Sequence, residues 1–226
     1  MLAESLVRRI RASYRRLLAD QIDRLLWIGD EPAFARLFGE VWPVLQWDHR
    51  PTARRLFEIA GGGPGEGAIV EIGSFLGNST VFLAATGRGT VHAVDPHDDD
   101  SMLQVPGDTQ TSEQFLATLR QFGVDDKVIY HRATSIDSAR SWQGGPVRFL
   151  FIDGLHTYSA VVEDFESWQP HFAPEHVVLF DDFLWPEVDA AVRELRRRHG
   201  PPWFAVRGGQ AIFSTQPLSL RMAGLP

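Results

Sequence analysis

The spacing of hydrophobic positions along the chain changes near residue 61. Between residues 2 and 28 apolar side chains recur every three or four positions, with arginines opposite them, which predicts one amphipathic helix. A shorter helix is predicted over residues 52–60, and the run Gly61-Gly62-Gly63-Pro64-Gly65 after it is a strong chain-breaking signal. We therefore expect a helical N-terminal extension over residues 1–60, which acts as a lid or in oligomerisation, and a second region over residues 61–226.

Beyond residue 61, short apolar runs alternate with segments that are compatible with helices. This order is typical of βαβ units on a mostly parallel sheet, whose strands are buried on both faces. The runs are Ala68–Ile72, Val91–Val94, Lys127–Tyr130, Val147–Ile152 and His176–Phe180. Two more, Trp203–Val206 and Gln210–Phe213, flank Arg207-Gly208-Gly209 and predict a closing hairpin. The expected fold is a doubly wound α/β domain with a helical N-terminal extension.

Composition excludes several function classes. The 226 residues carry a formal net charge of −7 and no polybasic run, which disfavours nucleic acid and anionic membranes as partners. The absence of cysteine excludes disulfides, thiol nucleophiles and cysteine-ligated metals. The N-terminus lacks the apolar core of a secretory signal, and no apolar run approaches the roughly 18 residues of a membrane span, so we expect a cytoplasmic protein.

The amphipathic helix over residues 2–28 leaves two alternatives. It lies on a membrane surface or acts in targeting, or it packs on the body of the protein or on a partner subunit. The second is favoured because the apolar stripe needs an apolar partner, and it makes this helix a surface for homo-oligomer formation.

The first strand of the second region runs into a glycine-containing loop, Glu71–Thr80. Gly73 permits a tight turn and Gly77 a close approach of the backbone to a ligand, while Asn78, Ser79 or Thr80 is expected to cap the following helix. The free N–H groups of such a helix favour an anionic group such as a carboxylate. Phe75 stands where a dinucleotide site has its middle glycine, which disfavours NAD.

Asp95 ends the second strand, 22 residues after Gly73. An acidic side chain at about this offset binds ribose hydroxyls in nucleoside-binding α/β folds. The loop and the acid together favour an adenosine-type cofactor with a short charged tail, and S-adenosylmethionine fits. Glu71 then either faces the ammonium group of this cofactor or stabilises the turn.

Three carboxylates follow the fourth and fifth strands: Asp153, Asp181 and Asp182. Because the carboxyl ends of neighbouring parallel strands share one edge of a sheet, these side chains are expected to converge. Oxygen ligands suit a hard divalent cation such as Mg²⁺ or Ca²⁺, with Mg²⁺ expected first. The alternative is that Asp181 or Asp182 caps the next helix and only one of them faces the ligand crevice.

His156 lies three residues after Asp153. Its imidazole titrates near neutral pH, so it is a candidate general base for a substrate hydroxyl. A metal ligand and a polar residue at a helix start are the alternatives.

At these residues the chain resembles the class I S-adenosylmethionine-dependent methyltransferases. Within them it is similar to the group of small-molecule O-methyltransferases that includes metal-dependent sugar methyltransferases of antibiotic biosynthesis and cephalosporin-hydroxylase-like proteins. The matching stretches, between residue 68 and about residue 198, are Val70–Thr80, Val91–Pro96, Phe151–Tyr158 and Val178–Phe183.

The resemblance implies a seven-stranded Rossmann-like sheet, and it implies roles for particular residues. S-adenosylmethionine would lie along Glu71, Gly73, Ser74, Gly77, Asn78, Ser79 and Asp95. A divalent cation would be bound by Asp153, Asp181 and Asp182, with His156 near the acceptor oxygen. Where the family commonly has Gly-Asp-Ser this chain has Ala133-Thr134-Ser135, so Thr134 or Ser135 is expected to contact adenine.

The predicted function is methyl transfer to a hydroxyl of a small molecule, with the cation as Lewis acid and template. A sugar or polyhydroxylated natural product as acceptor is suggested by the resemblance alone. The alternatives are a metal-independent methyltransferase that uses His156, and a protein that binds S-adenosylmethionine without catalysis. The polar loop from Pro96 to Gly107 is expected either to cover the substrate or to be a solvated loop. Trp185 is expected either to cover the substrate or to be a packing residue.

Overall fold

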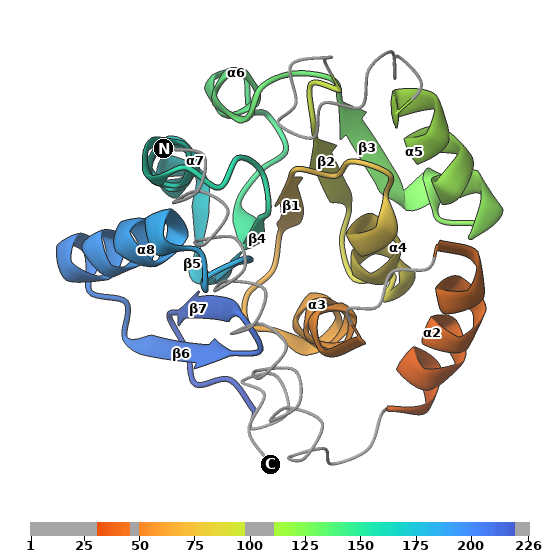
Figure 1. Cartoon of the computed structure of the whole chain (residues 1–226), viewed down its shortest axis with the longest axis horizontal. Helices are drawn as coiled ribbons and strands as arrows, with labels where there is room; N and C mark the ends of the chain where they lie inside the picture. The colour runs from red at the N-terminus through yellow and green to blue at the C-terminus, as the bar shows by residue number, and fades with distance from the viewer. Residues whose placement is uncertain (1–30, 46–49, 98–110, 220–226) are drawn as a thin grey trace, which may run out of the picture.

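A seven-stranded sheet lies at the centre of the computed structural model, which describes residues 31–45, 50–97 and 111–219 (Figure 1). The strand order is β3-β2-β1-β4-β5-β7-β6; β1 to β5 are parallel, and β7 pairs antiparallel with both β5 and β6. The strands are β1 (Ala68–Ile72), β2 (Val91–Val94), β3 (Val128–His131), β4 (Val147–Ile152), β5 (Phe172–Phe180), β6 (Trp203–Arg207) and β7 (Gln210–Ser214). The predicted doubly wound fold is confirmed.

Helices cover both faces of the sheet (Figure 1). One face packs against α2 (Pro32–Leu45), α3 (Arg50–Gly62), α4 (Asn78–Ala85) and α5 (Thr111–Gln121). The other packs against α6 (Ser135–Arg140), α7 (Tyr158–Trp168) and α8 (Pro186–His199), and the 3₁₀ turns are η1 (Asp125–Lys127) and η2 (Gln169–His171). Because strand residues alternate between two apolar layers, the strands read as continuous hydrophobic runs.

The observed strands differ from the predicted ones mainly at their ends. Lys127 belongs to the 3₁₀ turn η1, so β3 begins one residue later than expected, and β5 begins at Phe172 rather than His176. The early part of β5 contains Pro174 and exposed residues, so it does not form a continuous apolar run in the sequence.

The described part of the first 60 residues shares a core with the sheet. Phe34 and Phe38 of α2 and Leu56 of α3 are buried in the same apolar cluster as Phe82 of α4. The amphipathic helix predicted over residues 2–28 lies outside the described residues. Within the described ranges, no helix is long and apolar enough to cross a membrane.

A buried histidine pair joins two parallel strands. His92 of β2 is 7% exposed, and its Nδ1 lies 2.9 Å from Nε2 of His131 on β3. The edge of Trp142 covers its ring, with the ring centroids 4.5 Å apart. Burial lowers the pKa of His92 to about 4, and the neighbouring His131 adds to the effect. The native protein therefore holds His92 neutral.

This pair predicts a loss of stability in mild acid. As pH falls from the ordinary pKa of 6.5 towards 4, the unfolded chain binds a proton at position 92 that the native state does not. The free energy of unfolding should fall by about 1–3 kcal/mol from this group. Urea denaturation between about pH 7 and pH 4 should show a correspondingly flatter pH dependence for His92→Gln. An unchanged slope in that variant would contradict the prediction.

Candidate functional site

The chain reverses its direction of travel across the sheet between β1 and β4. From β1 it proceeds outward to β2 and β3, then returns to place β4 on the other side of β1 (Figure 1). Such a switch point leaves a crevice at the carboxyl ends of the two strands, which is where open α/β sheets bind ligands. Ile72 pairs with Ile152, and Ile152 with Phe180, so the residues after β1, β4 and β5 meet at this crevice.

Gly73 is the contact point between the loops after β1 and β4. Its φ is +87°, and a Cβ atom there would collide with the carbonyl oxygen of Asp153. Side chains other than hydrogen are therefore excluded at this position. The glycine-containing loop and the acidic segment at Asp153 therefore lie directly against each other.

The helix cap predicted at residues 78–80 is wrong. Gly77 occupies the N-cap of α4 in a left-handed conformation (φ +85°), and no side chain caps the helix. The side chains of Ser79 and Thr80 are buried, and the Thr80 hydroxyl donates to Glu71 Oε2 at 2.5 Å. A buried carboxyl group thus attracts the hydroxyl that the sequence pattern assigns to the helix end.

Glu71 is fully buried beneath the loop. Burial raises its pKa to about 8, so the carboxyl group is mostly protonated at neutral pH. Its hydrogen bond with Thr80 joins the end of β1 to α4, and a contact with the ammonium group of the cofactor stays a prediction. Its Oε1 has no hydrogen-bond partner among the described residues.

Asp95 contacts the loop from the end of β2. Its Oδ2 accepts the backbone N–H of Phe75 at 2.8 Å, and its Oδ1 accepts that of His97 at 2.8 Å. The two features that the sequence separates by 22 residues are therefore in direct contact. Each carboxylate oxygen keeps a further lone pair for a ribose hydroxyl.

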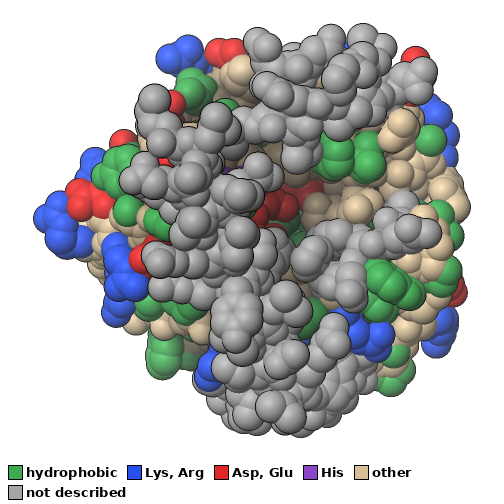
Figure 2. Space-filling model, in the orientation of Figure 1, with side chains coloured by type: hydrophobic (Ala, Val, Ile, Leu, Met, Phe, Trp, Pro, Cys, Tyr) green, Lys and Arg blue, Asp and Glu red, His purple; other side chains and the backbone are tan. Residues whose placement is uncertain are grey.

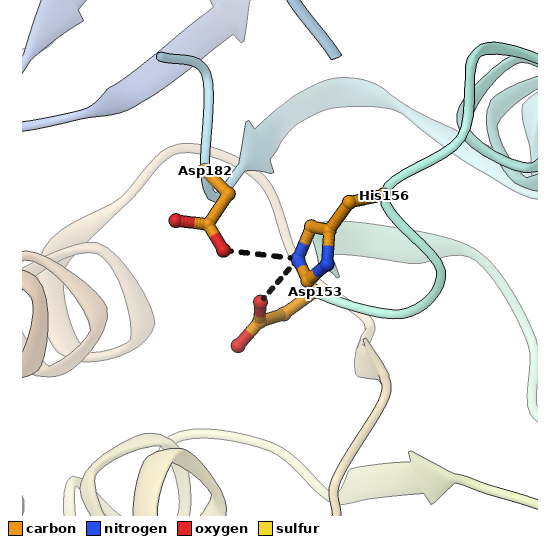
Figure 3. A group of neighbouring side chains, drawn as sticks. All are labelled: Asp153, His156 and Asp182. Carbon is orange, nitrogen blue, oxygen red and sulfur yellow. Dashed lines mark ion pairs between the residues drawn. The ribbon is translucent and has the colours of Figure 1, made fainter. Parts of the chain in front are cut away.

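Asp153, His156 and Asp182 form a cluster that can hold a metal ion. Each offers one ligand atom, and these atoms lie within 4.8 Å of one another. Nε2 of His156 is 3.1 Å from Asp182 Oδ2 and 3.5 Å from Asp153 Oδ1, so both contacts in Figure 3 end at one nitrogen. Both contacts are ion pairs when His156 is protonated, and this nitrogen is buried. The three ligand atoms converge on one small region that a metal ion could occupy instead of that proton.

This cluster differs from the predicted ligand set in one member. His156 supplies the third donor, whereas Asp181 lies outside the cluster. Asp181 is buried, and its Oδ1 accepts the backbone N–H of Asp182 at 2.9 Å. Its negative charge still reaches Asp153 and is one reason why the pKa of that carboxyl is raised.

The protonation of the cluster follows from its crowding. Burial raises the pKa of Asp153, and the charges of Asp181 and Asp182 raise it further. Burial opposes the charged form of His156, but its three carboxylate neighbours outweigh this, so the imidazole pKa lies above its ordinary value. A positive charge is therefore favoured at the centre of the cluster, and either a proton or a metal ion can supply it.

A strained turn aims Asp182 at the cluster. Its φ is +48°, a conformation that non-glycine residues rarely adopt. The backbone N–H of Phe183 donates to Gly209 in the β6–β7 hairpin at 2.7 Å, and that of Trp185 donates to the Asp182 carbonyl at 2.8 Å. The half-buried Trp185 stacks on His156 with ring centroids 5.8 Å apart. Neither the Gly209 contact nor this stacking was predicted, because no local pattern in the sequence signals either one.

Thr134 and Ser135 hold the start of α6. Thr134 Oγ1 accepts the backbone N–H of Asp137 at 3.2 Å, and Ser135 Oγ accepts from Trp168 Nε1 at 3.0 Å. Both hydroxyls thus have hydrogen-bond partners, and the adenine contact stays a prediction.

Most of the polar loop expected between Pro96 and Gly107 lies outside the described residues. Acidic side chains gather near the middle of the crevice face (Figure 2).

Comparison with known proteins identifies the family of this chain. A family model described as a methyltransferase domain matches residues 70–183, about half of the chain, from β1 to just beyond β5. Cofactor-bound Rv0187 from MTB is 20% identical, with a TM-score of 0.58 over 88% of this chain and 96% of that one. An O-methyltransferase from Bacillus cereus in complex with SAH is 16% identical, with a TM-score of 0.57 over 86% and 95%.

CalS11, a TDP-rhamnose 3′-O-methyltransferase of calicheamicin biosynthesis, is 17% identical, with a TM-score of 0.55 over 84% of this chain and 98% of that one. At sequence identities this low, the structural likeness shows a common fold only. The match to the family model is what assigns the chain to a family. The chain belongs to the methyltransferase-domain family and, as the resemblance implied, is a class I S-adenosylmethionine-dependent methyltransferase.

Proposed function

We propose that this methyltransferase transfers the methyl group of S-adenosylmethionine to a hydroxyl oxygen of a small molecule, assisted by a divalent cation at Asp153, His156 and Asp182. The observation that carries the proposal is the convergence of these three donors within 4.8 Å, directly beside the Gly73 turn. The structural likeness to O-methyltransferases, among them the Bacillus cereus protein and CalS11, supports oxygen as the acceptor atom.

The methyl donor would lie along the glycine-containing loop. Asp95 faces the loop with lone pairs available for ribose hydroxyls, and the N-terminus of α4 follows Gly77 with no side-chain cap. Its free N–H groups suit the donor's carboxylate. Because Gly73 contacts the backbone of Asp153, a sulfonium bound here would be close to the acidic cluster.

The donor set fits a divalent cation of intermediate hardness. Carboxylates suit Mg²⁺ and Mn²⁺, and an imidazole widens the choice towards later transition metals. When bound, such an ion acts as a Lewis acid that lowers the pKa of the acceptor hydroxyl and fixes its oxygen. Trp185 keeps the imidazole plane in place, and the Asp182 turn directs its carboxylate to the same point.

Positioning accounts for much of the catalysis in this proposal. The acceptor hydroxyl gives up its proton to solvent, and its oxygen forms a bond to the methyl carbon as the bond from that carbon to sulfur breaks. Holding the two reactants in line is worth roughly 7–11 kcal/mol. The contact between Gly73 and Asp153 fixes the distance between the donor and acceptor parts of the site.

A metal-independent reaction is the second candidate, and the orientation of His156 favours it. The same Nε2 lies between two carboxylates, which hold the ring and raise its pKa. After it loses the proton that these carboxylates stabilise, the imidazole would accept the hydroxyl proton as general base. The two candidates are mutually exclusive at this atom, since a nitrogen that binds a metal ion cannot accept a proton.

Metal removal distinguishes the two. After dialysis against a chelator, titration with Mn²⁺ followed by electron paramagnetic resonance should show one bound ion per chain. Methyl transfer should fall at least about ten-fold without metal and recover with Mg²⁺ or Mn²⁺. Full activity in the chelated protein, without Mn²⁺ binding, would favour His156 as the base.

Single substitutions should identify the third ligand. Asp153→Asn, Asp182→Asn and His156→Leu should each weaken Mn²⁺ binding by about ten-fold or more, because each removes a ligand. Asp181→Asn is the matched control and should have a smaller effect, since Asp181 is buried against the backbone of Asp182. All four should bind S-adenosylhomocysteine with the wild-type affinity. Loss of Mn²⁺ binding in Asp181→Asn but not in His156→Leu would restore the three-carboxylate set.

The acceptor class is proposed to be a sugar or another polyhydroxylated natural product. Neighbouring hydroxyls could chelate the cation, and CalS11, which has the same fold, is a methyltransferase of a nucleotide-linked sugar. A panel of nucleotide sugars and catechols with methyl-labelled S-adenosylmethionine tests this class. Labelling of catechols alone would contradict it.

A further inference from the structure

His97 connects the loops that follow β1 and β2. It lies two residues beyond Asp95, is 7% exposed, and is not among the residues expected to bind the cofactor. Its ring packs between Phe115 and Tyr130, at centroid distances of 5.6 and 5.3 Å. Both ring nitrogens of a histidine this buried need hydrogen-bond partners, and this histidine lies beside the proposed donor site.

The ring and Asp95 together hold one residue of the loop. Nε2 of His97 lies 2.7 Å from the carbonyl oxygen of Phe75, while the N–H of the same residue donates to Asp95 Oδ2 at 2.8 Å. Asp95 and His97 are themselves joined, because Asp95 Oδ1 accepts the His97 backbone N–H. Both backbone polar groups of Phe75 are therefore bound by residues at the end of β2.

The hydrogen-bond pattern places a hydrogen on Nε2 of His97. A carbonyl oxygen only accepts, so Nε2 must carry the hydrogen that bonds to Phe75. Nδ1 lies 2.7 Å from the Tyr130 hydroxyl and 3.3 Å from the Asp95 carbonyl oxygen. Burial raises the pKa of Tyr130 to about 12, so this hydroxyl keeps its proton. Both ring nitrogens of His97 therefore have hydrogen-bond partners, and Phe75 is the partner of Nε2.

The bound residue has an unfavourable backbone conformation. Phe75 has a φ of +41° and His97 a φ of +45°, in the left-handed region that side chains other than hydrogen disfavour. Such conformations persist only where surrounding contacts enforce them. Phe75 stands between Gly73 and Gly77, within the loop that would bind the donor, so its conformation sets the shape of that loop.

We propose that His97 is a positioning residue for S-adenosylmethionine binding: with Asp95 and Tyr130 it forms a clamp that fixes the Phe75 backbone before the donor arrives. This inference rests on the proposed function, because it assumes that the donor binds along Glu71–Ser79. A loop already held in its bound shape loses less entropy on binding, which increases affinity. The clamp also couples Asp95 to the loop, so one acid serves both the ribose site and the loop.

The test compares His97→Leu, which loses both ring hydrogen bonds, with His97→Gln, whose amide nitrogen can replace Nε2. By calorimetry, the Kd for S-adenosylhomocysteine should rise about ten-fold in His97→Leu and about three-fold or less in His97→Gln. Amide hydrogen exchange of the unliganded protein should quicken in the peptide that contains Phe75 and Gly77. Mn²⁺ affinity should not change, because the metal cluster lies on other loops.

His176→Gln is the matched control. His176 also has a ring nitrogen within hydrogen-bond distance of a backbone carbonyl, that of Ala173 at 2.7 Å, but in β5 away from the crevice. Its variant should bind S-adenosylhomocysteine as the wild type does. If His97→Leu does not fold, Tyr130→Phe performs the same test, with an expected loss of about three-fold and faster exchange at Phe75.

The outcomes separate the clamp from the proposed function. Failure of the wild type to bind S-adenosylhomocysteine would reject the proposed donor, whereas the exchange measurement would still report on the clamp. Wild-type binding with unchanged affinity and exchange in His97→Leu, or in Tyr130→Phe if that variant is used, would overturn the inference. Equal losses in His97→Gln and His97→Leu would likewise contradict a role for the Nε2 hydrogen bond.

Discussion

The approach of Gly73 to the Asp153 carbonyl is the contact on which both parts of the site depend. Parallel pairing places β1 beside β4, and the missing side chain at residue 73 lets the two following loops touch. One loop has the features of a nucleoside site, and the other carries Asp153 and His156, two of the three members of the acidic cluster. A methyl transfer needs its two reactants within one bond-forming distance. Under the proposed function, a backbone contact rather than a mobile side chain would set that spacing.

Negative charge is concentrated at this edge and is compensated locally. Glu71 is mostly protonated through burial, and the carboxylates of Asp153 and Asp182 face the imidazole of His156. The arrangement favours cationic ligands, and the proposed metal ion and the sulfonium of the proposed donor are both cationic. The electrostatics of the crevice and the proposed chemistry are thus consistent with each other.

The strands and the positions of the site residues were predictable from the sequence, because buried parallel strands leave continuous apolar runs and site residues follow them directly. Which of two adjacent aspartates faces the cluster was not. That choice depends on the left-handed backbone of Asp182, held by Gly209 from a hairpin remote in the chain. The misplaced helix cap has a similar origin, since Thr80 bonds to Glu71 across nine residues of sequence. A local sequence pattern predicts only what neighbouring residues favour. The orientation of Asp182 and the hydrogen bond of Thr80 both depend on residues farther away in the sequence.

The hydrogen bond between Phe183 and Gly209 has a consequence for how such enzymes diversify. It fastens the Asp182 turn to the edge hairpin, whereas the donor loop is fastened to β2 through Asp95. The two halves of the crevice are therefore anchored to opposite wings of the sheet. Under the proposed function, mutations near the β6–β7 hairpin would change the acceptor side of the crevice while the donor side keeps its geometry. An enzyme lineage would in this way acquire new acceptor substrates without changes to its binding site for the methyl donor.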